Sequence, residues 1–293
     1  MSLPRQIVPG ATYMVTRSTS QREFLLKPSK LTNQIFLYCL AVAAERTGVI
    51  VHAVCALSNH YHGIFSDPLG RLPEFYGWLH LFVGKSLNAS YGRWESLWSS
   101  DGTSCVRLFD AAAVLDKVAY TIVNPVEAGL VSHHTQWPGV LLYKPGRITV
   151  GRPKGFFRDA GPTAERVTLE IVAPPIGAAD ADVAGVIDRC VAEREAGFRA
   201  AAHEQGRRFM GRAAVLAQRH TDRPRTREPR RNLSPRVACR NKWARIEALQ
   251  RCKAFVVAYR DAWRRWCAGT RDAEFPHGTY LMARRFEVVT AET

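Results

Sequence analysis

The order of strand-like and helix-like segments in the first half of the chain constrains its fold most. Val49 to Leu57 and Tyr61 to Phe65 are rich in β-branched and aromatic residues, and Ser58-Asn59 between them has turn composition. These segments predict an antiparallel hairpin. Before the hairpin, Ala11 to Thr19 has the composition of a strand, and Gln34 to Arg46 has apolar residues at helical spacing.

Two further helices are predicted after the hairpin. Leu72 to Tyr91 has helical spacing, and so has Ala111 to Asn124, for which Asp110 is the expected N-cap and Pro125 the expected end. The order β-α-β-β-α-β-α predicts an α+β fold, with a ferredoxin-like antiparallel sheet and helices on one face. We expect this domain to span residues 1–145.

The rest of the chain predicts a different organisation. Residues 146–180 contain more Gly and Pro and one expected strand, Arg166 to Val172, and are interpreted as a bridge. Residues 181–293 predict a basic, mainly helical extension with a helix over Asp182 to Glu204. A long helix is expected from Ser234-Pro235 to a stop at Gly269.

The long helix carries one apolar stripe, which predicts that it packs on the first domain or on a second subunit rather than inserting into DNA. The stripe comprises Trp243, Ile246, Leu249, Cys252, Val256, Tyr259, Trp263 and Trp266.

Positive charge is concentrated in the last third of the chain. The chain has 41 Lys and Arg against 26 Asp and Glu, a formal charge of +15, and residues 201–293 hold 21 of these cations against 9 of these anions. Such a field favours nucleic acid, although membrane surfaces and acidic proteins are attracted by the same physics. The side chains we expect to contact DNA are Lys85, Arg223, Arg225, Arg227, Arg230 and Arg231.

Other protein classes are disfavoured by the sequence. It has no run of eighteen apolar residues and no secretory signal at its start, which predicts a cytoplasmic protein without a membrane partner. The seven cysteines are scattered and include no C-x-x-C pair, so neither a zinc knuckle nor a disulfide framework is expected.

Four side chains form the candidate site. Residues two apart on a strand share a face with Cα atoms roughly 7 Å apart, so His60 and His62 can face one metal ion while Tyr61 points away. Tyr120 and Asn124 lie one helical turn apart. Taken singly, each has a plainer interpretation: a hydrogen-bonded histidine pair, a core tyrosine, and an asparagine that caps the turn after it.

The combination resembles a known family. S-N-H-Y-H-G-I-F is similar to the histidine-hydrophobic-histidine (HUH) strand of single-tyrosine transposases, and Y-T-I-V-N-P-V-E-A-G-L-V resembles the tyrosine helix of REP-associated tyrosine transposases. P-G-A-T-Y-M-V-T-R-S resembles their first strand, so the resemblance covers about residues 1–145. Two departures are Tyr61 between the histidines and Thr121 after Tyr120.

The resemblance implies a function and a role for each residue. Tyr120 would be the nucleophile, and His60, His62 and Asn124 would hold Mg²⁺ or Mn²⁺. The expected activity is nicking and rejoining of single-stranded or hairpin DNA through a 5′-phosphotyrosyl intermediate. An HUH relaxase or replication initiator and a non-catalytic hairpin-DNA-binding protein remain alternatives. A homodimer is possible, with Tyr120 acting in its own subunit or in the partner.

Overall fold

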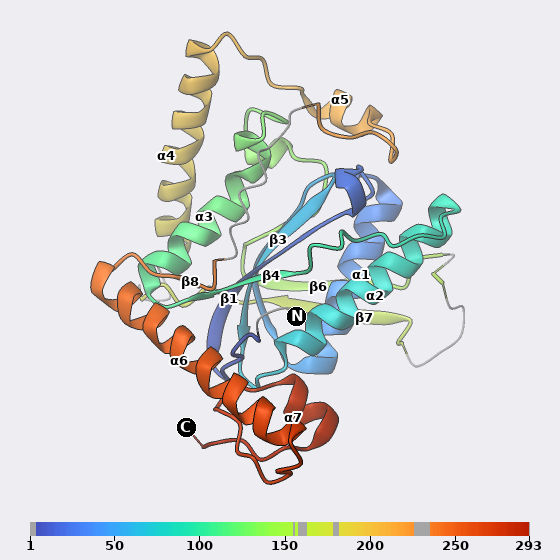
Figure 1. The fold of residues 1–293 in the computed structure, drawn as a ribbon. Helices are drawn as coiled ribbons and strands as arrows, with labels where there is room; N and C mark the ends of the chain where they lie inside the picture. The colour runs from blue at the N-terminus through green and yellow to red at the C-terminus, as the bar shows by residue number, and fades with distance from the viewer. Residues whose placement is uncertain (1–3, 155, 158–162, 178–181, 226–234, 293) are drawn as a thin grey trace.

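The computed structural model describes residues 4–154, 156–157, 163–177, 182–225 and 235–292, and it is built around one eight-stranded sheet. Figure 1 shows this sheet between two groups of helices. The strand order is β6-β7-β2-β3-β1-β4-β8, with β5 paired to β2 off this path.

Four antiparallel strands form the centre of the sheet: β1 (Ala11–Ser18), β2 (Ile50–Ala56), β3 (His60–Asp67) and β4 (Ser104–Leu108). β3 pairs with β2 on one side and with β1 on the other, and β1 also pairs with β4. The predicted hairpin is therefore confirmed, and the α+β class with it.

Helices cover both faces of the sheet. α1 (Lys30–Thr47) and α2 (Leu72–Tyr91) pack with Tyr13 and Phe65 on one face, whereas α3 (Ala111–Glu127) and α4 (Val183–Glu204) pack with Met14 and Ile64 on the other (Figure 1). The prediction of helices on one face was wrong. Helices cover both faces because the central strands carry apolar residues at both odd and even positions, and both faces of the sheet must therefore be shielded from water.

The sheet continues past residue 145. β5 (Leu141–Leu142) pairs with β2, and the hairpin of β6 (Gly146–Gly151) and β7 (Arg166–Ile171) joins the β2 edge through a parallel contact of β7. The strand expected near Arg166 is confirmed, and β5 and β6 were not predicted. At the other edge, β8 (Val237–Ala238) pairs with β4.

α3 continues through Pro125 to Glu127, so the expected end at Pro125 was wrong, and so was the interpretation of Asn124 as a cap. Proline removes one N–H, but it lies in the last turn of this helix. Gly129, at φ 69°, and Leu130 donate to the carbonyls of Val126 and Pro125 and close the end of the helix. The helix therefore loses one hydrogen bond and keeps its direction.

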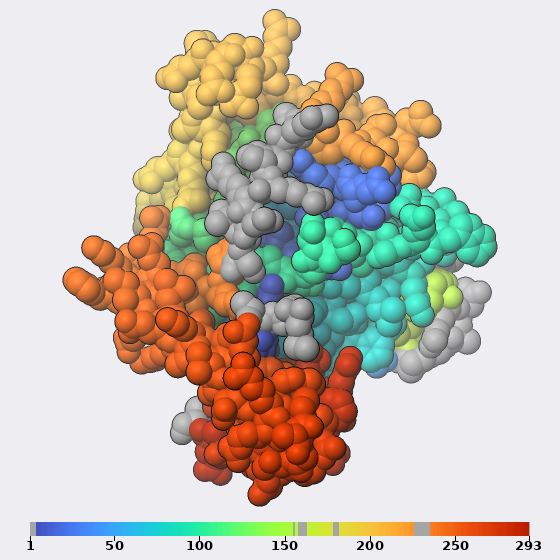
Figure 2. All heavy atoms as spheres, in the orientation of Figure 1, coloured from blue at the N-terminus to red at the C-terminus, as the bar shows by residue number. Residues whose placement is uncertain are grey.

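The C-terminal segment contains α5 (Arg212–Ala217), α6 (Lys242–Cys267) and α7 (Leu281–Phe286). Figure 2 shows residues near the C-terminus gathered in a lobe at one end of the molecule. α6 begins later than predicted because the chain first pairs with β4 as β8, and Asn241, whose side chain accepts from the Trp243 and Ala244 amides, caps it. Among the described residues, no helix is long and apolar enough to cross a membrane.

The apolar stripe predicted on α6 is buried over only part of its length. Trp243 is 74% exposed and Leu249 49% exposed, whereas Tyr259, Trp263 and Trp266 pack with Phe275 and Met282. The fully buried side chains of α6 are Ala248, Phe255 and Ala262, which repeat every seven residues. The buried face is therefore rotated from the predicted one at the start of the helix.

Two short 3-10 helices complete the elements, η1 (Ser20–Arg22) and η2 (His134–Gln136). η1 follows β1, and η2 lies in the turn after α3.

Replacing Asp110 with alanine is expected to destabilise the protein by about 1–2 kcal/mol, because an N-cap carboxylate satisfies otherwise unpaired helix amides. Asp110 Oδ1 accepts from the Ala113 amide at 2.6 Å, which confirms the predicted cap, and Oδ2 accepts from Cys239 Sγ at 2.7 Å. Urea unfolding measures the change. The matched control is Asp182→Ala, since Asp182 precedes α4 but makes no cap hydrogen bond. An equal loss in both variants would contradict the prediction.

Candidate active site

A cavity of about 900 Å³ opens between the end of β3, the segment after β1 and the last turns of α3. His60, His62, Tyr120 and Asn124 all line it. Residues that are sixty positions apart in the sequence are thus brought together at one place, on the α3 side of the sheet.

The two histidines lie side by side on one face of β3. Their ring centroids are 4.8 Å apart, and the next residue on that face, Ile64, packs in the apolar cluster of α3. Tyr61 points to the opposite face, where its hydroxyl lies 2.7 Å from His80 Nε2. The expected alternation along this strand is confirmed.

Each histidine is oriented through its Nδ1 atom. His60 Nδ1 lies 2.7 Å from Asn59 Oδ1, and His62 Nδ1 lies 2.8 Å from Thr16 Oγ1. Because the Asn59 oxygen can only accept, His60 Nδ1 donates and its Nε2 keeps a lone pair. His62 Nε2 is buried and has no hydrogen-bond partner in the described part of the chain. Metal-binding histidines are held in this way by partners on the other ring nitrogen, so the donor set fits a metal ion.

Both imidazoles are held in the neutral form. Burial, and then the charge of Arg22, lowers the pKa of His60 to about 4. Burial, and then His60 and Lys117, lowers the pKa of His62 well below its ordinary value. A neutral imidazole is the form that binds a metal ion, so neither histidine must lose a proton at neutral pH to act as a ligand.

α3 brings Tyr120 and Asn124 to the histidines. The Tyr120 ring lies 5.2 Å from the His62 ring, and Asn124, one turn later and 6% exposed, contributes a side-chain hydrogen bond to His60. Lys117 Nζ lies 5.7 Å from the centroid of the Tyr120 ring. A hydroxyl group, an amide and a positive charge thus come from one side of one helix.

Sequence reasoning missed three residues of this site. Thr16 is the strand partner of His62, which only the register of β1 and β3 reveals. Asn59 was read as a turn residue only. Glu127 also lines the cavity, seven residues after Tyr120, and burial raises its pKa. Glu127 lies at helical spacing from Tyr120, but the predicted end of the helix at Pro125 excluded it.

The cavity wall also contains a strained segment. Gln21 and Arg22 line the cavity with φ values of 50° and 59°, in the left-handed region that residues other than glycine seldom adopt.

The residues expected to contact DNA are spread over the molecule. Lys85 lies on α2, across the sheet from the histidines, with its ammonium 5.4 Å from the Phe157 ring. Arg223 forms an ion pair with Glu23 at 2.6 Å, next to the cavity residue Arg22, and Arg225 is exposed. Arg227, Arg230 and Arg231 lie outside the described residues. DNA contact by all six side chains stays a prediction.

Comparisons with known proteins found no matching family model and no matching curated protein. Among solved structures, the chain is similar to a REP-associated tyrosine transposase bound to a REP hairpin, at 18% identity and a TM-score of 0.38, over 47% of this chain and 81% of that one. It is also similar to a protein of Deinococcus radiodurans R1 provisionally assigned as a transposase, at 16% identity and a TM-score of 0.29, over 36% and 85%. Both TM-scores are below 0.5, so these similarities alone establish neither a function nor a site.

Proposed function

We propose that this protein is a metal-dependent single-tyrosine transposase of the HUH group, similar to REP-associated tyrosine transposases, that nicks and rejoins single-stranded DNA at hairpins. The observation that carries the proposal is the position of Tyr120 beside His62, whose buried Nε2 lacks a hydrogen-bond partner within the described residues. A tyrosine that only packs in the core, or a histidine pair that only lies on the surface, would not place a tyrosine beside a buried histidine nitrogen in one cavity.

The strand arrangement supports the proposed fold of the catalytic domain. The order β2-β3-β1-β4 with antiparallel neighbours is that of a ferredoxin-like β-α-β-β-α-β unit. In this proposal residues 1–145 are the catalytic domain, residues 146–180 the bridge, to which β6 and β7 belong, and residues 181–293 the basic extension.

The donor set has a clear use in phosphodiester cleavage. Held by the imidazoles of His60 and His62 and the amide oxygen of Asn124, Mg²⁺ or Mn²⁺ would polarise the phosphoryl group and stabilise charge on the leaving oxygen. Two imidazole ligands bind Mn²⁺ more tightly than they bind Mg²⁺. Lys117 adds a positive charge near Tyr120, which favours the approach of an anionic backbone.

Tyr120 performs the covalent step. Its hydroxyl oxygen forms a bond to phosphorus as the hydroxyl proton is lost to solvent, and the bond from phosphorus to the 3′ oxygen breaks. The 3′ oxygen takes up a proton and leaves as a free hydroxyl. The bond energy is conserved in a 5′-phosphotyrosyl linkage, and attack by a 3′ hydroxyl on that linkage reverses the step and joins strands.

A hairpin oligonucleotide with single-stranded flanks tests the proposal. The full chain is incubated with this DNA and Mn²⁺ or Mg²⁺, and the products are separated under denaturing conditions. We expect a label at the 3′ end to migrate with the protein and a label at the 5′ end to be released on a shorter strand. The opposite distribution would exclude a 5′-phosphotyrosyl linkage.

The same assay distinguishes the alternatives. Hairpin binding without any cleavage, unchanged by mutation of His60, His62 or Tyr120, would identify a non-catalytic DNA-binding protein. Cleavage at one strand site without rejoining to a second strand would favour a relaxase or replication initiator.

Replacing Thr16 with valine is expected to raise the Mn²⁺ concentration for half-maximal adduct formation by about 10- to 100-fold, the usual effect of losing the partner of a metal-binding histidine. Valine keeps the shape of the side chain and removes the oxygen that holds His62 Nδ1 at 2.8 Å. The matched control is Thr12→Val on the same strand, since Thr12 contacts Ser66 instead. Identical metal dependence in the two variants would refute a role for Thr16 in orienting His62.

A further inference from the structure

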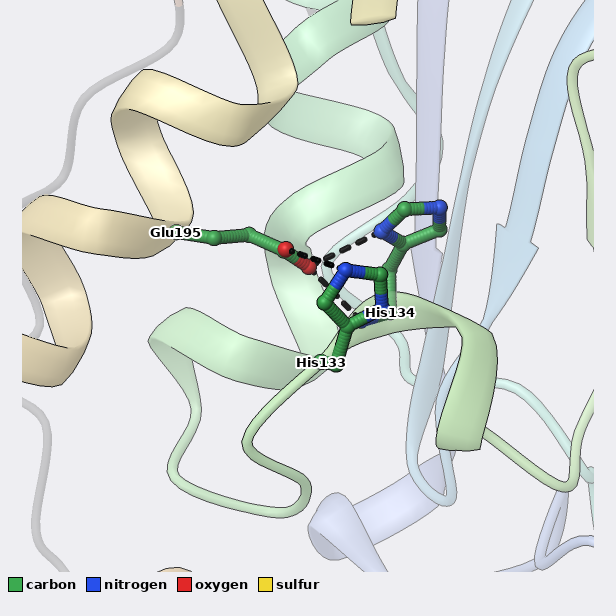
Figure 3. A group of neighbouring side chains, drawn as sticks. All are labelled: His133, His134 and Glu195. Atoms are coloured by element: carbon green, nitrogen blue, oxygen red, sulfur yellow. Dashed lines mark hydrogen bonds and ion pairs between the residues drawn. The ribbon is translucent and has the colours of Figure 1, made fainter.

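A second group of metal-binding side chains lies between η2 and α4. Figure 3 shows the Glu195 carboxylate of α4 pointing at the imidazoles of His133 and His134. His133 Nε2 lies 3.1 Å from Glu195 Oε2, and His134 Nδ1 lies 2.9 Å from Glu195 Oε1. One donor atom from each of the three residues falls within 4.8 Å of the others.

The carboxylate of this group is deeply buried. The Glu195 side chain is 2% exposed and that of His134 9% exposed, whereas His133 is 45% exposed. A carboxylate removed from water needs strong compensation. Glu195 Oε1 accepts from the His134 amide at 2.6 Å, and Arg199 approaches Oε2 only to 3.5 Å. The two imidazoles therefore supply most of the remaining compensation.

Both imidazoles are oriented by hydroxyl groups on their far nitrogens. His134 Nε2 lies 3.0 Å from the Tyr143 hydroxyl, and His133 Nδ1 lies 2.7 Å from Thr135 Oγ1. His133 Nδ1 also accepts from the Thr135 amide at 3.3 Å, so the proton of this imidazole lies on Nε2, which faces Glu195. A cation bound by the three residues would take the place of the proton between His133 Nε2 and Glu195 Oε2, while the far nitrogens stay held by the two hydroxyl groups.

We propose that His133, His134 and Glu195 form a second metal site that takes Zn²⁺ or a similar first-row transition-metal ion. Two nitrogens and one carboxylate oxygen are a common zinc donor set, whereas Mg²⁺ prefers oxygen donors and water. The exposed edge of His133 leaves room for water as a fourth ligand. The three residues lie outside the cavity of Tyr120, so the site does not depend on the proposed DNA chemistry.

The consequence for the fold is a link between distant segments. Glu195 lies 61 residues from His134 along the chain, and the ion would join α4 to the turn that follows the Tyr120 helix. Without an ion, the same contacts form a hydrogen-bonded ion cluster. The two states differ in one measurable property, the zinc content of the protein.

Zinc content of the full chain tests the site. All variants are made in a background protein that already carries His60→Ala and His62→Ala, which removes the candidate active-site ligands. A chelator buffer fixes the concentration of free Zn²⁺ before metal analysis. We expect one zinc per chain to be lost when Glu195→Gln is added, and His133→Ala to weaken binding at least about 10-fold. The seven thiols contribute equally to every variant, so only differences between variants are assigned to the site.

Two exposed residues of α4 provide matched controls. Glu193→Gln and His203→Ala remove the same chemical groups and should leave the zinc content unchanged. If Glu195→Gln does not fold, as judged by circular dichroism, His133→Ala decides, because it leaves the buried His134 and Glu195 pair intact. Equal zinc content and affinity in the background and His133→Ala proteins would overturn the proposal.

Discussion

Tyr120→Phe is expected to abolish the covalent DNA adduct, with a loss of at least about 10³-fold, the order reached when an enzyme loses its nucleophile. The change removes one oxygen and keeps the ring that packs 5.2 Å from His62. DNA binding should therefore remain within a few-fold of the unmodified protein. Denaturing gels report the adduct, and a native gel with the same oligonucleotide reports binding.

Tyr259→Phe is the matched control for this change. Tyr259 lies on α6, is partly buried against Phe275 and does not line the cavity. It should form the adduct at the normal rate. If Tyr120→Phe also formed the adduct at that rate, another residue would be the nucleophile and the proposed function would fail in its central step.

His62→Ala is expected to reduce adduct formation by about 10²- to 10³-fold, the cost of removing one group that stabilises transition-state charge. The substitution deletes the buried Nε2 that faces no protein partner within the described residues, and it leaves Thr16 without its imidazole contact. Residual activity should need more Mn²⁺ than the unmodified protein. A titration of Mn²⁺ against adduct yield separates weaker metal binding from slower chemistry.

His203→Ala controls for loss of an imidazole in general, since His203 is exposed on α4. Removal of metal with EDTA should stop adduct formation in both His203→Ala and unmodified protein, and added Mn²⁺ or Mg²⁺ should restore it. Cleavage that persists in EDTA, with unchanged activity in His62→Ala, would show that the histidine pair has a structural role only.

Local patterns predicted the central features of the site. The two-residue period of β3 separated His60 and His62 from Tyr61, and the four-residue spacing of Tyr120 and Asn124 placed both on one helical face. Such periods depend on backbone geometry within one element. They hold whatever the rest of the molecule does, so the sequence alone was sufficient for them.

Features that depend on contacts between elements were not predictable in this way. Thr16 reaches His62 only because β1 and β3 pair in one register, and Glu195 reaches His134 across 61 residues. The burial of both sheet faces was visible in the apolar run from Tyr13 to Val15, which was read only as a strand. The late start of α6 likewise follows from a contact between elements, the pairing of Val237 and Ala238 with β4, whereas the predicted cap Ser234 lies outside the described residues.

Asp110 is shared by two distant parts of the chain. Its Oδ1 caps the helix that carries Tyr120, while its Oδ2 accepts from the Arg240 amide at 2.8 Å, just before α6. Both contacts draw on one carboxylate, so they are linked thermodynamically. A ligand that tightens residues 239–241 on Asp110 would therefore change the stability of α3. By whatever factor it altered the affinity of a second ligand at Tyr120, that second ligand would alter its affinity in return.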